Sequence, residues 1–246
     1  MKSENKFQNF NRANRVHFID SVRGVAMIYI MLYHLFYDLI EFCGFRLDFF
    51  YSAWFELLHI TMFSLLFFVS GVSTNFSRNS LKRGVMIFFI GQIITIITGV
   101  IMPGSPIIFG VLTFIGLSMM IYSLIKPLTE KIQIPWAVVF TAMTAAYIAL
   151  FNFPHRTDAP FAEFTYPFGI MSNAFSSSDY FPLIPYFFVF AAGAAFAVPI
   201  LKGKMPRFFY NTRLPAVNFI GRHSLIFYAV HQPVFIVVLY IVGVIK

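Results

Sequence analysis

The chain has 246 residues, of which 59% are hydrophobic, 20% aromatic and 11% charged, and its mean hydropathy is +0.75. A soluble domain carries about 25% charged residues because its surface faces water. This composition therefore excludes an ordinary soluble domain, even with a net charge of +8. The single cysteine, Cys43, excludes an internal disulfide framework.

Apolar segments follow one another along the chain and are long enough to cross a bilayer. A hydrocarbon core of about 30 Å needs about 20 helical residues. Seven stretches meet this length: 17–40, 54–76, 82–102, 106–126, 135–152, 181–201 and 220–244. We predict an all-α polytopic membrane protein, a bundle of about seven transmembrane helices. It forms one membrane-embedded domain over 1–246, in which 1–15 is a polar cytoplasmic segment.

The basic residues predict the orientation of this bundle. With a cytoplasmic N-terminus and seven crossings, fifteen of the eighteen Lys and Arg residues fall on the inner side, and Arg46, Arg156 and Lys246 fall outside. Cytoplasmic segments of membrane proteins are enriched in Lys and Arg. The asymmetry therefore predicts an inner N-terminus, an outer C-terminus and residence in the plasma (cytoplasmic) membrane. It accounts for the net charge, so we expect the bilayer and no nucleic acid as a partner.

The first predicted helix carries Arg23, His34 and Asp38 within an apolar stretch. Eleven residues advance about 16 Å along a helix and return to nearly the same direction, so Arg23 and His34 share a face. Asp38 lies one turn further on, within reach of the imidazole. Packing against a neighbouring helix or headgroups is one interpretation. Since ionisable groups are costly in a membrane and usually mark a pathway or site, we favour a functional one.

Two later segments hold further polar groups. Asp179 and Tyr180 end a long segment on the predicted outer side, where Asp179 either caps the helix that comes next or serves the site. His231 and Gln232 lie in the middle of the last predicted helix, immediately before Pro233. They either satisfy a carbonyl that the proline leaves without a donor or belong to the site. No HExxH motif or cysteine pair is present, so we predict no metal.

Several segments resemble one family. "IDSVRGVAMIYIMLYHLFYDL" is similar to the first helix of bacterial relatives of the heparan-alpha-glucosaminide N-acetyltransferase catalytic domain. "FFVSGVS", "LKRG", "FGVLTFIGLS", "SSDYFPLIPYFFVFAAG" and "LIFYAVHQPV" come after it in the family's order, so the resemblance covers about residues 15–242. The spacing of Arg23 and His34 also resembles the R-x10-H signature of the wider transmembrane acyltransferase superfamily. Thr113 departs from the family pattern, because we expect a histidine at this position in close bacterial relatives.

The resemblance implies an acyl-CoA-dependent enzyme with a cytoplasmic acetyl-CoA donor and an acceptor on the far side of the membrane. The expected acceptor is a sugar, an amino sugar or a cell-envelope glycan, which receives the acetyl group on a nitrogen or on an oxygen. By the same resemblance Arg23 helps to hold the donor and His34 is the catalytic histidine. His34 either deprotonates the acceptor or is itself acylated, and we expect Asp38 to orient it.

The expected site residues fall into three groups. They are His34, Asp38 and His231 for catalysis, Arg23, Lys82, Arg83 and Arg222 for the donor, and Asp179, Tyr180 and Gln232 on the acceptor side. A proton-coupled transporter or flippase is an alternative function, because the same residues suit a proton relay. An inactive membrane subunit of an envelope complex is another, and a homodimer stays open.

Overall fold

The computed structural model describes residues 16–104, 106–212 and 214–243. The predicted polar segment 1–15 lies outside these residues. Six described helices are long and apolar enough to cross a membrane. They are α2 (His17–Glu41), α3 (Ala53–Thr74), α4 (Ser80–Ile101), α5 (Val111–Ile132), α8 (Leu183–Leu201) and α11 (Ser224–Ile241). The predicted class, an all-α polytopic membrane protein, is confirmed.

The fifth predicted span, 135–152, is a shorter apolar helix, α6 (Trp136–Ala149). Its 14 residues extend about 21 Å at 1.5 Å per residue, less than the hydrocarbon thickness of about 30 Å. The prediction for 135–152 is therefore too long. The number of crossings, and with it the side that each terminus faces, stays a prediction.

Two other helix boundaries differ from the prediction, each for a local reason. The helix expected from residue 106 begins at Val111, because Phe109 adopts a left-handed backbone with φ of 58°, which a helix does not tolerate. The helix expected over 220–244 is divided at His223 into α10 (Pro215–Arg222) and α11.

The described chain divides into two compact units. The first runs to Val69 and resumes at Gly203, and it holds α2, η1 (Asp48–Tyr51), most of α3, α9 (Arg207–Asn211), α10 and α11. The second, Ser70–Lys202, holds α4, α5, α6, β1 (His155–Thr157), α7 (Ala162–Thr165), η2 (Tyr166–Phe168), β2 (Ile170–Ser172) and α8. The prediction of one domain over 1–246 stays a prediction.

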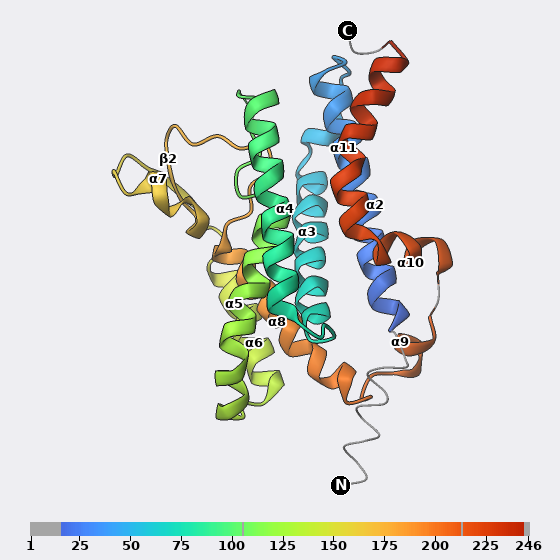
Figure 1. Cartoon of the computed structure of the whole chain (residues 1–246), viewed down its shortest axis with the longest axis vertical. Helices are drawn as coiled ribbons and strands as arrows, with labels where there is room; N and C mark the ends of the chain where they lie inside the picture. The colour runs from blue at the N-terminus through green and yellow to red at the C-terminus, as the bar shows by residue number, and fades with distance from the viewer. Residues whose placement is uncertain (1–15, 105, 213, 244–246) are drawn as a thin grey trace. The chain divides into compact units, whose positions relative to one another are not determined.

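Helix α2 is the centre of the first unit. Helix α11 runs alongside it and α10 lies across it (Figure 1). Ala26, Met27 and Ile30 of α2 are almost completely buried. Aromatic contacts join α2 to η1 and α3; Tyr33, for example, stacks on Phe50 with ring centroids 5.0 Å apart.

The second unit is organised around two helix pairs, α4 with α5 and α6 with α8. A β-carbon on Gly116 of α5 would collide with the backbone nitrogen of Phe88 in α4, so this pair packs backbone against backbone. Gly116 therefore allows the close packing of α4 on α5. Between α6 and α8, β1 and β2 form a parallel pair in which His155 lies opposite Ile170.

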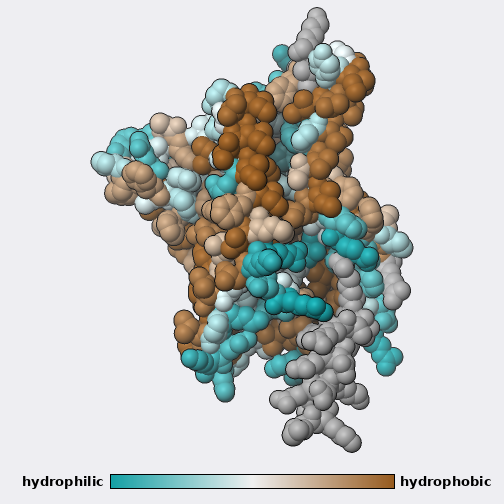
Figure 2. Space-filling view, viewed as in Figure 1, coloured by the Kyte–Doolittle hydropathy of each residue, from teal (hydrophilic) through white to brown (hydrophobic). Residues whose placement is uncertain are grey.

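Exposed apolar side chains cover the helices of each unit, as contact with lipid requires. Figure 2 shows hydrophobic surface along α11 of the first unit and along α4 of the second. The side chains on α11 include Val234, Val237, Val238, Tyr240 and Ile241, and those on α4 include Phe89, Ile93, Ile96, Ile97 and Val100.

Candidate active site

Two histidines from opposite ends of the chain face each other within the first unit. The ring centroids of His34 on α2 and His231 on α11 are 5.0 Å apart. His231 is 8% exposed, and Asp38, one turn beyond His34, is fully buried. The structure therefore brings together all three residues that the sequence nominated for catalysis.

Asp38 forms its hydrogen bond with α11 and not with His34, which lies one turn earlier on α2. The amide nitrogen Nε2 of Gln232 donates a hydrogen bond to Oδ1 of Asp38 at 2.8 Å. The other carboxylate oxygen, Oδ2, is buried and has no hydrogen-bond partner among the described residues. The predicted hydrogen bond from Asp38 to His34 is not formed, because the carboxylate is turned toward the amide of α11. Gln232, predicted on the acceptor side, thus contacts a residue predicted for catalysis.

A backbone contact fixes the tautomer of His231. Its Nδ1 lies 2.7 Å from the carbonyl oxygen of Tyr228. Since a carbonyl can only accept, Nδ1 carries the proton and Nε2 of the neutral ring is a base. That Nε2 is buried without a hydrogen-bond partner in the described structure. Pro233 deprives the carbonyl of Ala229 of its donor, so the contact that His231 makes is not the structural repair considered from the sequence.

Tyr33 and His59 extend this group toward α3, which the sequence did not indicate. The Tyr33 ring lies 4.1 Å from that of His59 and 5.7 Å from that of His34. The Nδ1 atom of His59 is also buried without a partner among the described atoms. Because a lone histidine carries little signal, only its place beside Tyr33 relates His59 to the site.

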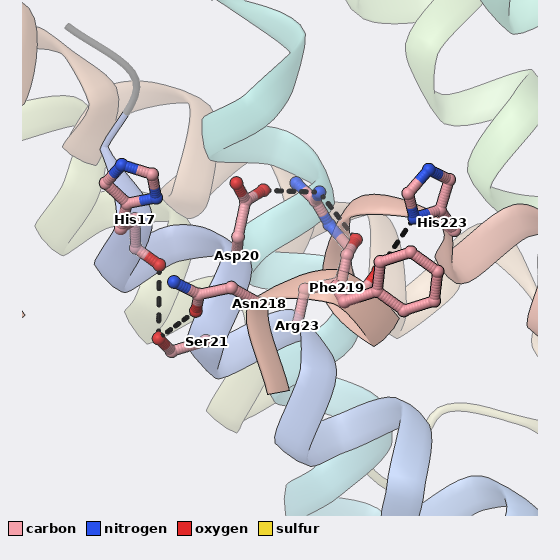
Figure 3. Close-up of polar contacts among 8 residues, drawn as sticks. His17, Asp20, Ser21, Arg23, Asn218, Phe219 and His223 are labelled. Carbon is pink, nitrogen blue, oxygen red and sulfur yellow. Dashed lines mark hydrogen bonds and ion pairs between the residues drawn. The ribbon is translucent and has the colours of Figure 1, made fainter. Parts of the chain in front are cut away.

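Arg23 lies at the end of α2 that is predicted to face the cytoplasm, where it contacts α10 (Figure 3). Its Nη1 donates to the carbonyl oxygen of Gly221 at 3.2 Å and lies 3.4 Å from Oδ1 of Asp20. Two residues before Arg23, Ser21 Oγ donates to Oδ1 of Asn218 at 2.5 Å. The donor-binding role expected for Arg23 stays a prediction.

The other three expected donor cations are exposed. Arg222 ends α10 in the first unit, whereas Lys82 and Arg83 lie in the first turn of α4 in the second. Asn79 begins α4 and accepts a hydrogen bond from the backbone N–H of Lys82. An exposed cation can pair with a phosphate group, as the expected role requires.

Asp179 and Tyr180 belong to the second unit, immediately before α8. Oδ2 of Asp179 accepts a hydrogen bond from the backbone N–H of Val111, the first residue of α5, at 3.2 Å. The carboxylate thus caps α5 and not the next helix in the chain, which was one of the two interpretations of Asp179 from the sequence. The Tyr180 hydroxyl donates to the carbonyl of Tyr166 at 2.5 Å, and burial raises the pKa of this phenol.

Thr113 is buried near the start of α5. Its Oγ1 accepts a hydrogen bond from Nε2 of Gln92 on α4 at 3.4 Å. A β-carbon on Gly91 would meet this hydroxyl, so the two helices approach closely there. Thr113 therefore has a packing role, at the position where the family resemblance suggests histidine.

Among the described residues, no three His, Cys, Asp or Glu side chains are grouped so that they could hold a metal ion.

Comparison with known proteins gives one clear match. The family model described as heparan-alpha-glucosaminide N-acetyltransferase, catalytic, matches residues 15–233, which include every site residue discussed above. No curated protein and no solved structure matches the chain significantly.

Proposed function

Because this chain belongs to the family of the heparan-alpha-glucosaminide N-acetyltransferase catalytic domain, whose members are membrane acetyltransferases, we propose a specific reaction for it. It transfers an acetyl group from cytoplasmic acetyl-CoA to an acceptor outside the plasma membrane, a sugar or glycan of the cell envelope. The family supports the acetyl transfer, and the basic-residue distribution supports the sidedness.

One observation carries the catalytic part of this proposal. The ring centroids of His34 and the buried His231 lie 5.0 Å apart within one unit, and a backbone carbonyl holds the tautomer of His231. Two imidazoles at this separation can bind one polar hydrogen between them or pass a proton from one to the other. A buried apolar packing role needs neither, so the pair supports acid–base chemistry.

The reaction needs a base for the acceptor and an acid for the leaving thiolate. The acceptor's nitrogen or oxygen attacks the thioester carbonyl, a C–N or C–O bond forms, and the C–S bond breaks. His34 takes the acceptor's proton, and that proton passes to the CoA thiolate, so charge and atoms balance. In the second route the imidazole nitrogen of His34 attacks the thioester carbonyl and expels the CoA thiolate. The acceptor then attacks the acetyl-imidazole and releases the imidazole, and the acceptor's proton passes to the thiolate. His231 serves either route through its unprotonated Nε2.

The donor and the acceptor have opposite requirements. Acetyl-CoA is polyanionic, so the exposed Arg222 of the first unit is proposed to hold its phosphates. The donor role expected for Lys82 and Arg83 of the second unit stays a prediction. On the acceptor side we propose Gln232, because its Oε1 is buried without a described partner and is an acceptor for a hydroxyl or amine. Asp179 and Tyr180 stay proposals that rest on the predicted outer location of their segment.

Radiolabelled acetyl-CoA and the detergent-purified protein test this function. The wild type is expected to release CoA faster when an amino sugar is added, and His34→Ala is expected to abolish that release. Label that remains on the protein in the absence of acceptor supports the acyl-histidine route. His223→Ala is the matched control, because His223 is held by the carbonyl of Phe219 in the α10–α11 turn. Folded wild type that neither binds acetyl-CoA nor releases CoA overturns the proposal and favours the transport alternative.

A further inference from the structure

The contact between α2 and α10 is unusually close. We define the α2–α10 joint as Asp20, Ser21, Arg23 and Gly24 of α2 with Val217, Asn218 and Gly221 of α10. A β-carbon on Gly24 would collide with the carbonyl oxygen of Val217, and one on Gly221 with that of Asp20. Glycine permits such an approach because it has no side chain. The two backbones therefore meet at two points.

Polar contacts fasten the same joint. Asn218 is buried and accepts the hydrogen bond from Ser21. The Arg23 side chain is 12% exposed and that of Asp20 is 6% exposed, so this ion pair is mostly withdrawn from water. Arg23 also donates to the carbonyl of Gly221, in the last turn of α10. Carbonyls there lack partners within the helix, and a cation beside them is stabilising.

Helix α10 leads directly into the helix that carries His231. After His223 the chain continues as α11, which returns to α2 through the Gln232–Asp38 hydrogen bond. Helices α10 and α11 are thus attached to α2 at two places, Arg23 and Asp38. These two residues are fifteen positions apart, which is about 22 Å along α2 at 1.5 Å per residue. The His34–His231 pair lies at the second attachment.

We propose that Arg23 is a positioning residue: it clamps the end of α10 to α2 and thereby sets where α11 places His231 against His34. The catalytic meaning of this clamp rests on the proposed acetyl transfer. Donor binding in the first unit then falls to Arg222, the exposed cation adjacent to Gly221. The expected donor role of Arg23 is the rival that the experiment separates.

Steady-state kinetics with acetyl-CoA distinguishes the two roles. Arg23→Gln is expected to lower kcat about 10²-fold, as small misplacements of catalytic groups do, with donor KM changed by less than about threefold. Asn218→Ala and Gly221→Ala damage the joint without removing a cation, and they are expected to lower kcat in the same way. Arg23→Lys keeps the charge but not the planar fork, and is expected to fall between. Arg207→Gln, an exposed arginine of the same unit, is the control. A donor KM raised more than about tenfold by Arg23→Gln, with kcat unchanged and Asn218→Ala silent, overturns the proposal.

A distance measurement tests the clamp without activity. Leu32 on α2 and Val230 on α11 are both exposed and accept spin labels once replaced by cysteine in a Cys43→Ser background. Double electron–electron resonance is expected to show a narrow distance distribution in the parent and the Arg207→Gln protein, and a broader or shifted one in Arg23→Gln and Gly221→Ala. An unchanged distribution in Arg23→Gln overturns the proposal. If the wild type proves inactive, the proposed function fails, while this measurement still decides whether Arg23 holds the two helices.

Discussion

Gln232 and Asp38 are separated by 194 residues in sequence, yet the amide of one donates to the carboxylate of the other at 2.8 Å. This hydrogen bond joins the last transmembrane helix to the first beside the two facing histidines. It replaces the short-range contact between Asp38 and His34 that the sequence suggested. The carboxylate therefore holds α11 in place next to His34.

Gln232→Leu should destabilise the protein, because it leaves a buried carboxylate without its donor. A loss of about 1–3 kcal/mol is expected for a buried polar group that loses its partner. The thermal midpoint of the detergent-solubilised protein measures the effect. Asp38→Leu combined with Gln232→Leu should cost less than the sum of the two single changes, since residues in direct contact are coupled. Strict additivity would contradict the importance of this contact.

His231→Asn should separate the structural role of His231 from its chemical role. The asparagine amide can still donate to the carbonyl of Tyr228, as Nδ1 does, but it provides nothing in place of Nε2. We expect a thermal midpoint near that of the wild type and a CoA release rate lower by about 10²–10⁴-fold, the usual value of an acid–base group. A variant that keeps the full rate would assign His231 to packing alone.

Asp179→Ala should destabilise the second unit by about 1 kcal/mol, the typical value of a helix N-terminal cap. The reason is that the backbone N–H of Val111 loses its acceptor at the start of α5. Asp179→Asn retains an oxygen at the same place and should lose less. If both variants have wild-type midpoints and both raise the acceptor KM, the carboxylate serves the acceptor rather than α5.

Gly116→Ala should destabilise the α4–α5 pair, because the added methyl group meets the backbone of Phe88. A loss of about 1–3 kcal/mol is typical of overpacking. The matched control is Gly99→Ala in α4, where a β-carbon meets nothing within 4 Å. That change should stabilise the protein by up to about 1 kcal/mol through helix propensity. Equal midpoints for the two variants would show that the helices can separate without cost.

Much of the architecture was predictable because it is a local property. A segment in lipid must satisfy its own backbone hydrogen bonds, so length and hydropathy identify a spanning helix without reference to its neighbours. Phe109 and His223 show where this approach fails. Each changes a helix boundary through its backbone conformation, with φ of 58° at Phe109 and −106° at His223. Hydropathy does not encode these angles.

The sequence by itself determined the class of protein, the apolar spans, and the choice of His34, Asp38 and His231 as residues of interest. The tertiary structure decided which groups meet. It placed His231 opposite His34, paired Asp38 with Gln232 through a hydrogen bond, and made Asp179 a cap of α5. These pairings depend on how helices distant in sequence pack together, and the periodicity within one helix gives the face of a residue but not the helix that the face contacts.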